Sequence, residues 1–93
     1  MSDISISDRP ELEYYQIDVD GTRAGLAAYE IEGGVIAFTH TEIDDAHEGQ
    51  GLGSRLIRYA LDDVRARGLK VRPVCPFVKT WIRRHEDYQD LLV

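Results

Sequence analysis

The stretch Glu48-Gly49-Gln50-Gly51-Leu52-Gly53 decides how this chain folds, because its three glycines stand directly before a sequence with helical periodicity. Helix N-termini carry unpaired backbone N–H groups and the positive end of the helix dipole. Glycines at such a terminus leave room for phosphate oxygens to approach the backbone. The stretch therefore predicts a phosphate-binding loop, with a flexible turn that merely leads into a helix as the alternative.

A helix is predicted after this loop, from Gly51 to about Arg67. Apolar residues recur there at the spacing of one helical face, and most charged residues lie outside that face. Gly68 stands where a helix is expected to end, just after two basic residues. The apolar face consists of Leu52, Leu56, Ile57, Ala60, Leu61 and Val64.

Three strands are predicted before the loop, within residues 11–43. The dipeptides Asp20-Gly21 and Gly33-Gly34 are typical of hairpin turns, so the three strands should form an antiparallel meander. Residues 1–10 end in a proline and are expected to form a flexible lead-in that precedes a single domain over residues 11–93.

A fourth strand and a second helix are predicted after Gly68. Residues 69–74 alternate like a strand, and Pro73 suggests that this strand lies at an edge of the sheet. Pro76 suits the first position of a helix. Because a helix connects the third and fourth strands, they should run parallel. The predicted fold is therefore α+β, with a mixed sheet.

Charge is distributed unevenly along the 93 residues, which carry a net charge of −6. Residues 1–50 hold 12 acidic and 2 basic residues, whereas residues 51–93 hold 5 acidic and 9 basic ones. The net charge argues against general nucleic-acid binding, which depends on neutralising phosphates. An anionic ligand would prefer the second half, unless its basic residues form only a solvated helix face.

The composition also bears on the compartment and the assembly. No apolar stretch reaches the roughly 20 residues needed to cross a bilayer, so no membrane association is expected. The single cysteine cannot form an internal disulfide, and the polar N-terminus does not resemble a signal peptide. We therefore expect a cytoplasmic protein, as a monomer or weak dimer. The three histidines have no metal-ligand spacing, so no metal is expected.

The segment from Asp45 to Gly68 resembles motif A of the GNAT superfamily of acyl-CoA N-acyltransferases, which reads Q/R-x-x-G-x-G/A. Gly51 and Gly53 match its two small positions, whereas Glu48 occupies the Q/R position. Since an acidic side chain cannot help to bind a pyrophosphate, backbone N–H groups would contribute more of the binding. Together with His40-Thr41-Glu42, Pro73-Val74-Cys75 and residues 82–88, the segment resembles a small single-domain branch of that superfamily, about 90–100 residues long.

The resemblance implies an acetyl-CoA site. In the superfamily two parallel strands separate and the pantetheine arm fits between them, so the backbone from Thr41 to Ile43 would contact that arm. The position at which many members carry a proton-donating tyrosine is closest to Trp81 here. The expected acetyl-CoA-binding residues are Thr41, Ile43, Glu48, Gly49, Gln50, Gly51, Leu52, Gly53 and Ser54.

Three residues are candidates for the chemistry. Cys75 stands at a predicted helix N-terminus, which favours a reactive thiolate and an acyl-enzyme; the alternative is a small buried hydrophobe. His40 could act as a base for the amine or for Cys75, or be a strand histidine satisfied by its neighbours. Glu42 shares a strand face with His40 and could orient it or act as the base through water, or be a solvated acid.

Three functions remain open at this point, and the weakest of them is a structural α+β interaction domain that binds no cofactor. The first is an acetyl-CoA-dependent N-acetyltransferase that modifies an amine such as an exposed protein lysine, either directly or through Cys75. The second is a non-catalytic module that binds acetyl-CoA as a sensor or for protein interaction, which the small size of the chain favours.

Overall fold

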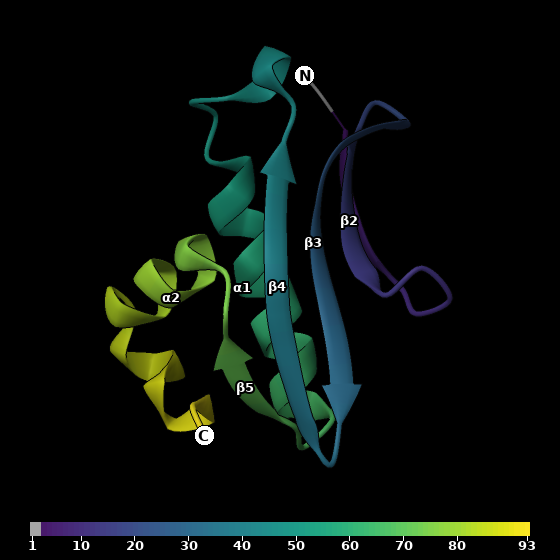
Figure 1. Ribbon diagram of the computed structural model, residues 1–93. Coiled ribbons are helices and arrows are strands. Elements are labelled where there is room, and N and C mark those ends of the chain that lie inside the picture. Colours follow the sequence, from purple (N-terminus) through teal and green to yellow (C-terminus); the bar gives the residue numbers. More distant parts are fainter. Residues whose placement is uncertain (1–2) are drawn as a thin grey trace.

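A single five-stranded sheet organises the computed structural model, which describes residues 3–93 (Figure 1). The strands follow one another across the sheet in chain order, and only the last pair is parallel. The predicted α+β class and the parallel fourth connection are therefore confirmed. The elements are β1 (Ile4–Arg9), β2 (Tyr14–Val19), β3 (Thr22–Glu32), β4 (Val35–Ile43), α1 (Leu52–Ala66), β5 (Lys70–Pro73) and α2 (Pro76–Arg83), with short 3-10 helices η1 (Asp45–His47) and η2 (Glu86–Leu91).

The expected flexible lead-in over residues 1–10 is wrong for Ile4–Arg9, which form the edge strand β1. Ile4 and Ile6 pair with residues of β2 and pack against the core, while polar residues alternate with them. This alternation stabilises a strand because it places every second side chain on the buried face. The antiparallel meander therefore has four strands rather than three, and the first two residues lie outside the described chain.

One face of the sheet is covered by α1, and α2 packs beside α1 at the β5 edge (Figure 1). All six residues of the predicted apolar face of α1 are buried, together with Gly53. The outer edge of β5 is partly covered by the C-terminus, because Leu92 forms a parallel bridge to Val71 and the Val93 N–H donates to the Val71 carbonyl. The helix prediction and the edge position of the fourth strand are both confirmed.

A bulge in β4 changes which side chains face the helices. Ala28 pairs with His40 and Tyr29 pairs with Phe38, so Thr39 has no partner of its own on β3. An extra residue reverses the alternation of a strand. Phe38 therefore faces the core before the bulge, Thr41 faces it afterwards, and His40 lies on the opposite side. We call this opposite side, which neither helix covers, the open face.

A half-buried polar cluster fastens the first three strands to the C-terminal end of α1. The Tyr15 hydroxyl donates to Asp63 at 2.6 Å, and the Tyr29 hydroxyl donates to Asp8 at 2.6 Å. The Arg67 guanidinium lies 3.5 Å from Asp63 and 3.6 Å from Asp8, so it bridges the two carboxylates. Burial first, and then hydrogen bonds to the carboxylates, raise the pKa of both tyrosines above their ordinary value.

Because of this cluster, the free energy of unfolding should change with pH in the alkaline range. In the unfolded chain the two tyrosines lose their protons near pH 10, whereas the folded chain retains them to higher pH. Their contribution is thus complete below about pH 10, and the free energy of unfolding should fall as the pH rises above that value. We expect the Tyr15→Phe/Tyr29→Phe double variant to show a shallower fall in urea titrations between neutral and alkaline pH. An unchanged slope would contradict this account.

Candidate functional site

The glycine loop adopts the backbone geometry that its sequence requires. Gly49 and Gly51 have φ angles of 81° and 75°, in the left-handed region that favours glycine. Gly51 is the N-cap of α1, and no side chain caps this helix. The first intrahelical bond runs from the Arg55 N–H to the Gly51 carbonyl. The N–H groups of the first helical turn are therefore available to an anion.

A hollow of about 500 Å³ lies between the end of β4 and the start of α1, and we call it the loop hollow. Eight of the nine residues expected to bind acetyl-CoA line it, and Gln50 does not. His47 and Phe77 also line it, and sequence reasoning missed both. The Nδ1 atom of His47 is buried without a hydrogen-bond partner in the described part of the chain. The eight are Thr41, Ile43, Glu48, Gly49, Gly51, Leu52, Gly53 and Ser54.

A second hollow, of about 610 Å³, lies between the start of α1 and α2, and we call it the helix hollow. It shares Ser54 and Phe77 with the loop hollow, so the two adjoin. Gly53 allows this closeness, because a Cβ atom there would lie 2.8 Å from the Phe77 ring. The helix hollow is lined by Ser54, Pro76, Phe77, Thr80, Trp81, Arg84 and His85.

The parallel strands β4 and β5 separate beside these hollows. Their pairing ends at Phe38 and Pro73, and the last link is the Cys75 N–H, which donates to the Phe38 carbonyl at 2.8 Å. Beyond this hydrogen bond β4 continues to Ile43, whereas the segment that follows β5 turns into α2. The backbone edge of β4 on this side therefore has no partner strand within residues 3–93. We call this opening the strand gap.

Cys75 and Thr41 meet at the inner side of the strand gap. The Cys75 thiol donates to the Thr41 hydroxyl at 3.4 Å, and the cysteine is only 5% exposed. The bulge at Thr39 is the reason for this contact, since without it Thr41 would point to the open face. A thiol and a hydroxyl thus lie together where the strands part.

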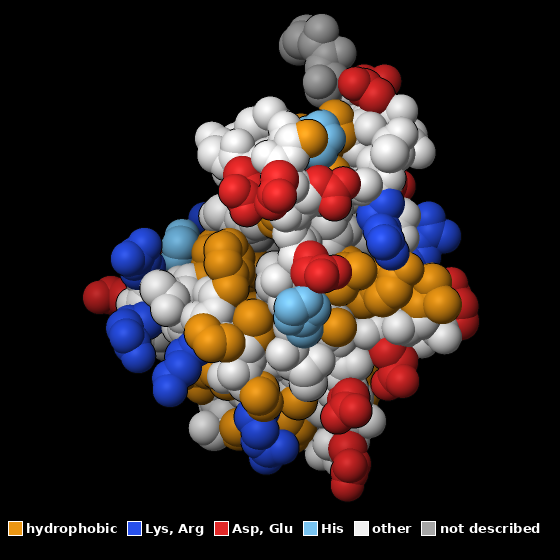
Figure 2. Space-filling view, turned by 45° about the horizontal axis from the view of Figure 1, so that its top comes forward, with side chains coloured by type: hydrophobic (Ala, Val, Ile, Leu, Met, Phe, Trp, Pro, Cys, Tyr) orange, Lys and Arg blue, Asp and Glu red, His pale blue; other side chains and the backbone are white. Residues whose placement is uncertain are grey.

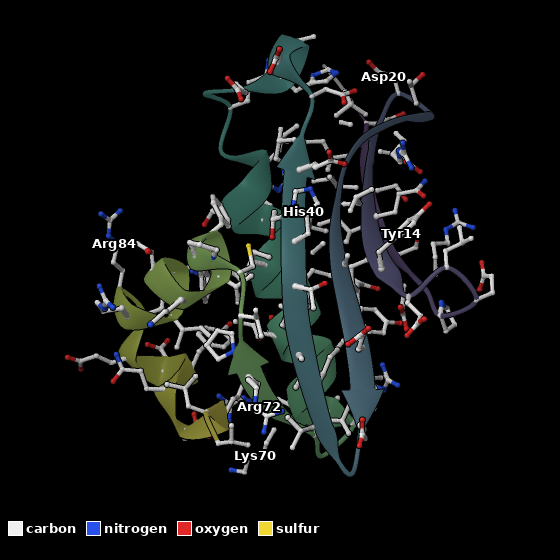
Figure 3. All side chains as sticks on the ribbon, in the orientation of Figure 1. Tyr14, Asp20, His40, Lys70, Arg72 and Arg84 are labelled. Atoms are coloured by element: carbon white, nitrogen blue, oxygen red, sulfur yellow. The ribbon has the colours of Figure 1, made fainter. Side chains whose placement is uncertain are left out.

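His40 and Glu42 form a second pair, on the open face. The His40 Nε2 atom lies 3.4 Å from a carboxylate oxygen of Glu42, and both side chains are 61% exposed. Figure 3 shows His40 on the viewer's side of β4, away from α1. The structure thus brings together the predicted histidine and glutamate, but it records no hydrogen bond between His40 and Cys75 among the described residues. Thr41, which contacts Cys75, thus lies on one face of β4, and His40 and Glu42 lie on the other.

Acidic and basic side chains lie in different places at this end of the molecule. Figure 2 shows acidic side chains over the loop region and basic ones at the side, over α2. Glu48 is exposed and lines the loop hollow. Arg84 lines the helix hollow and takes part in no ion pair within residues 3–93. The charged side chain of the loop is acidic, so positive charge beside the two hollows comes from the N–H groups of the first turn of α1 and from Arg84, which follows α2.

Trp81 connects the two helices. Its indole N–H donates to the Ser54 hydroxyl oxygen at 2.8 Å, and its ring stacks on His85 with centroids 3.7 Å apart. Because the Ser54 oxygen accepts this bond, the serine's own proton remains free for a ligand. The tryptophan therefore organises the helix N-terminus, and the tyrosine that many superfamily members use as an acid has no equivalent at this position.

Across residues 3–93, no three His, Cys, Asp or Glu side chains gather as a metal ion would require. Within the same residues, neither helix is long and apolar enough to span a membrane.

Comparison with known proteins gives a consistent family. The family model described as GCN5-related N-acetyl-transferase matches residues 14–91. No curated protein matches the chain significantly. A GCN5-like candidate N-acetyltransferase from Staphylococcus aureus, solved by NMR, is 25% identical and superposes with a TM-score of 0.77 over 100% of this chain and 91% of its own.

Two crystal structures share the fold at lower identity. The ribosomal-protein-S18-alanine N-acetyltransferase from Escherichia coli is 18% identical, with a TM-score of 0.69 over 96% of this chain and 77% of its own. The N-acetylglutamate synthase from Neisseria gonorrhoeae, complexed with coenzyme A and N-acetyl-glutamate, is 19% identical, with a TM-score of 0.63 over 87% of this chain and 21% of its own. The chain belongs to the GCN5-related N-acetyltransferase family and is an N-acetyltransferase enzyme.

Proposed function

We propose that this enzyme transfers the acetyl group of acetyl-CoA to the primary amine of an exposed lysine, with the thioester held in the strand gap. The observation that carries the proposal is the continuity of the loop hollow with that gap: Thr41 lines the first and contacts Cys75 in the second. One path thus connects a phosphate-binding helix terminus to a nucleophilic sulfur.

The donor site fits a CoA thioester. The N–H groups of the first turn of α1 would bind the pyrophosphate, and Ser54 would add its hydroxyl proton. The free edge of β4 from Thr41 to Ile43 would bind the amide groups of the pantetheine arm. The synthase from Neisseria gonorrhoeae, whose structure contains coenzyme A, supports the use of this fold for such a ligand.

The acceptor would approach from the open face. No helix covers that face in the described chain, so a side chain that projects from another protein can reach the strand gap (Figure 1). His40 would take a proton from the attacking ammonium or amine, and Glu42 would orient the imidazole and stabilise its cation. The exposed positions of both side chains favour a macromolecular acceptor, since no part of residues 3–93 encloses a small one.

In the direct route the amine nitrogen attacks the thioester carbonyl carbon. A C–N bond forms, the C–S bond breaks, the amine proton passes to His40, and the CoA thiolate takes up a proton from solvent. In the covalent route the Cys75 sulfur attacks first, so that a thioester to Cys75 forms as CoA leaves as its thiol. The amine then displaces Cys75, whose sulfur regains a proton.

Donor binding is tested at Gly51. Gly51→Asp adds bulk and a negative charge at the N-cap of α1, so we expect calorimetry to show loss of acetyl-CoA binding with an unchanged circular dichroism spectrum. Gly33→Asp is the matched control, because Gly33 also has a positive φ and open space around it but lies in the hairpin before β4. Equal affinity in both variants would show that the phosphates bind elsewhere.

The route is tested at Cys75. After mixing with acetyl-CoA, intact-mass spectrometry should detect one added acetyl group on the wild-type chain and none on Cys75→Ser, if the covalent route operates. Cys75→Ala, which keeps the small volume, should then lose transfer to a lysine peptide as well. Full activity in both variants, with no labelling of the wild type, would rule out the covalent route and leave the direct one.

A further inference from the structure

We infer that the acceptor lysine lies in an extended segment of a partner protein that crosses the open face, with an apolar residue two positions from the lysine and an acidic residue four positions from it. This inference rests on the proposed function, because it requires that the acceptor amine reach the strand gap from the open face. It extends that function by assigning the acceptor a sequence preference, which residues of β2 and β3 recognise.

Two rows of side chains lead across the open face from the pair formed by His40 and Glu42. In the sheet register His40 pairs with Ala28, and Ala28 pairs with Tyr14, so these three form one row. Glu42 pairs with Leu26 in the row beside it. Paired residues of neighbouring strands lie on the same face of a sheet, so both rows belong to the open face. We call the surface formed by Leu26, Ala28 and Tyr14 the acceptor strip.

The acceptor strip is apolar next to the two candidate catalytic side chains. Leu26, Ala28 and Tyr14 are partly exposed, whereas Tyr15 and Ala27, which face the helices from the same strands, are fully buried. Figure 2 shows apolar side chains gathered on this face, with basic ones at their border. Adjoining apolar side chains on an exposed face are typical of protein interaction sites. An apolar side chain of the acceptor would leave water when it packs against this strip.

Basic side chains border the far end of the acceptor strip. The exposed Arg23 guanidinium donates to the Tyr14 hydroxyl at 3.4 Å, and Arg9 pairs with Tyr14 from β1. Neither arginine forms an ion pair within residues 3–93. Asp18 pairs with Arg23 in the register, but its carboxylate accepts a hydrogen bond from Gln16 at 2.7 Å. The far end of the strip is therefore complementary to an acidic side chain.

The spacing of the strands determines the spacing of residues in the acceptor. Neighbouring strands lie roughly 4.8 Å apart, so from the outer side of β4 the strands β3 and β2 lie roughly 7 Å and roughly 12 Å away. Alternate side chains of an extended segment point the same way, at roughly 6.6 Å and roughly 13 Å from the lysine. The second residue from the lysine thus falls on Leu26 and Ala28, and the fourth falls on Tyr14 beside Arg23. Both residues can lie on either the N-terminal or the C-terminal side of the lysine.

The inference is tested by steady-state transfer from acetyl-CoA to synthetic peptides with blocked termini and a single lysine in a glycine and serine background. The full peptide carries leucine two positions and glutamate four positions from the lysine, and it is made in both chain directions. For at least one direction, serine in place of leucine should raise KM about tenfold and leave kcat within about twofold, because the contact is the same in the ground and transition states. Glutamine in place of glutamate should raise KM about threefold, as expected for an exposed ion pair.

Variants of the chain locate the preference on the acceptor strip. Leu26→Ser should raise KM for the leucine peptide to that of the serine peptide. Ile31→Ser is the matched control and should keep the preference, because Ile31 lies on the same strand and is 40% exposed but pairs with the buried Ile36 on the helix side. Arg23→Glu should favour arginine over glutamate at the fourth position. A destabilised fold could not produce this reversal.

The outcomes separate the inference from the proposed function. Equal kcat/KM for all the single-lysine peptides would overturn the assignment while the proposed function stands, since lysine would be acetylated whatever its neighbours are. A wild-type dimer in sedimentation equilibrium that Leu26→Ser dissociates would also overturn it, because a second copy would then cover the acceptor strip; a monomer supports it. If the wild type acetylates no lysine peptide, both the assignment and the proposed function fail.

Discussion

The separation of β4 from β5 after Phe38 is the constraint on which the rest of the structure depends. Two prolines enforce it: Pro73 has no N–H to extend the ladder, and Pro76 begins α2 instead of continuing the strand. The bulge at Thr39, directly after the point where the strands separate, adds a second effect. It turns Thr41 toward Cys75 and His40 toward the open face. One strand thereby presents different chemistry on its two faces, with the thioester of the proposed donor between them.

The two helices hold this opening in shape. α1 is anchored at its C-terminal end by the cluster around Arg67 and at its start by the Trp81–Ser54 hydrogen bond and the contact of Gly53 with Phe77. The C-terminal segment reinforces the same arrangement, since Arg65 donates to both carboxylate oxygens of Asp90 and the Tyr88 hydroxyl donates to Asp62. The proposed donor site is therefore built on packed elements rather than on the loop alone, which is what a site that must position a thioester requires.

Local sequence determined much of this architecture, and its failures have physical causes. The apolar face of α1, both glycine hairpins and the parallel strand follow from periodicity and turn residues. β1 was missed because Pro10 and the polar residues suggested a lead-in, although the alternation of Ile4 and Ile6 was visible. The bulge at Thr39 has no local signal, since it exists only through pairing with β3. Phe77 and Arg84 were missed for the same kind of reason: their positions at the hollows depend on how α2 packs across the start of α1, which no spacing within either helix reveals.

The central claim is that the donor lies between β4 and β5 with its phosphates on the first turn of α1. The most direct test is a titration of the ¹⁵N-labelled chain with CoA, followed by amide chemical shifts for each residue. The account predicts that the largest changes fall on Thr41 to Ile43 and on Gly49 to Ser54, with smaller ones on α2. Amide changes confined to the open face around Ala28 and His40, with the glycine loop unaffected at saturation, would contradict it.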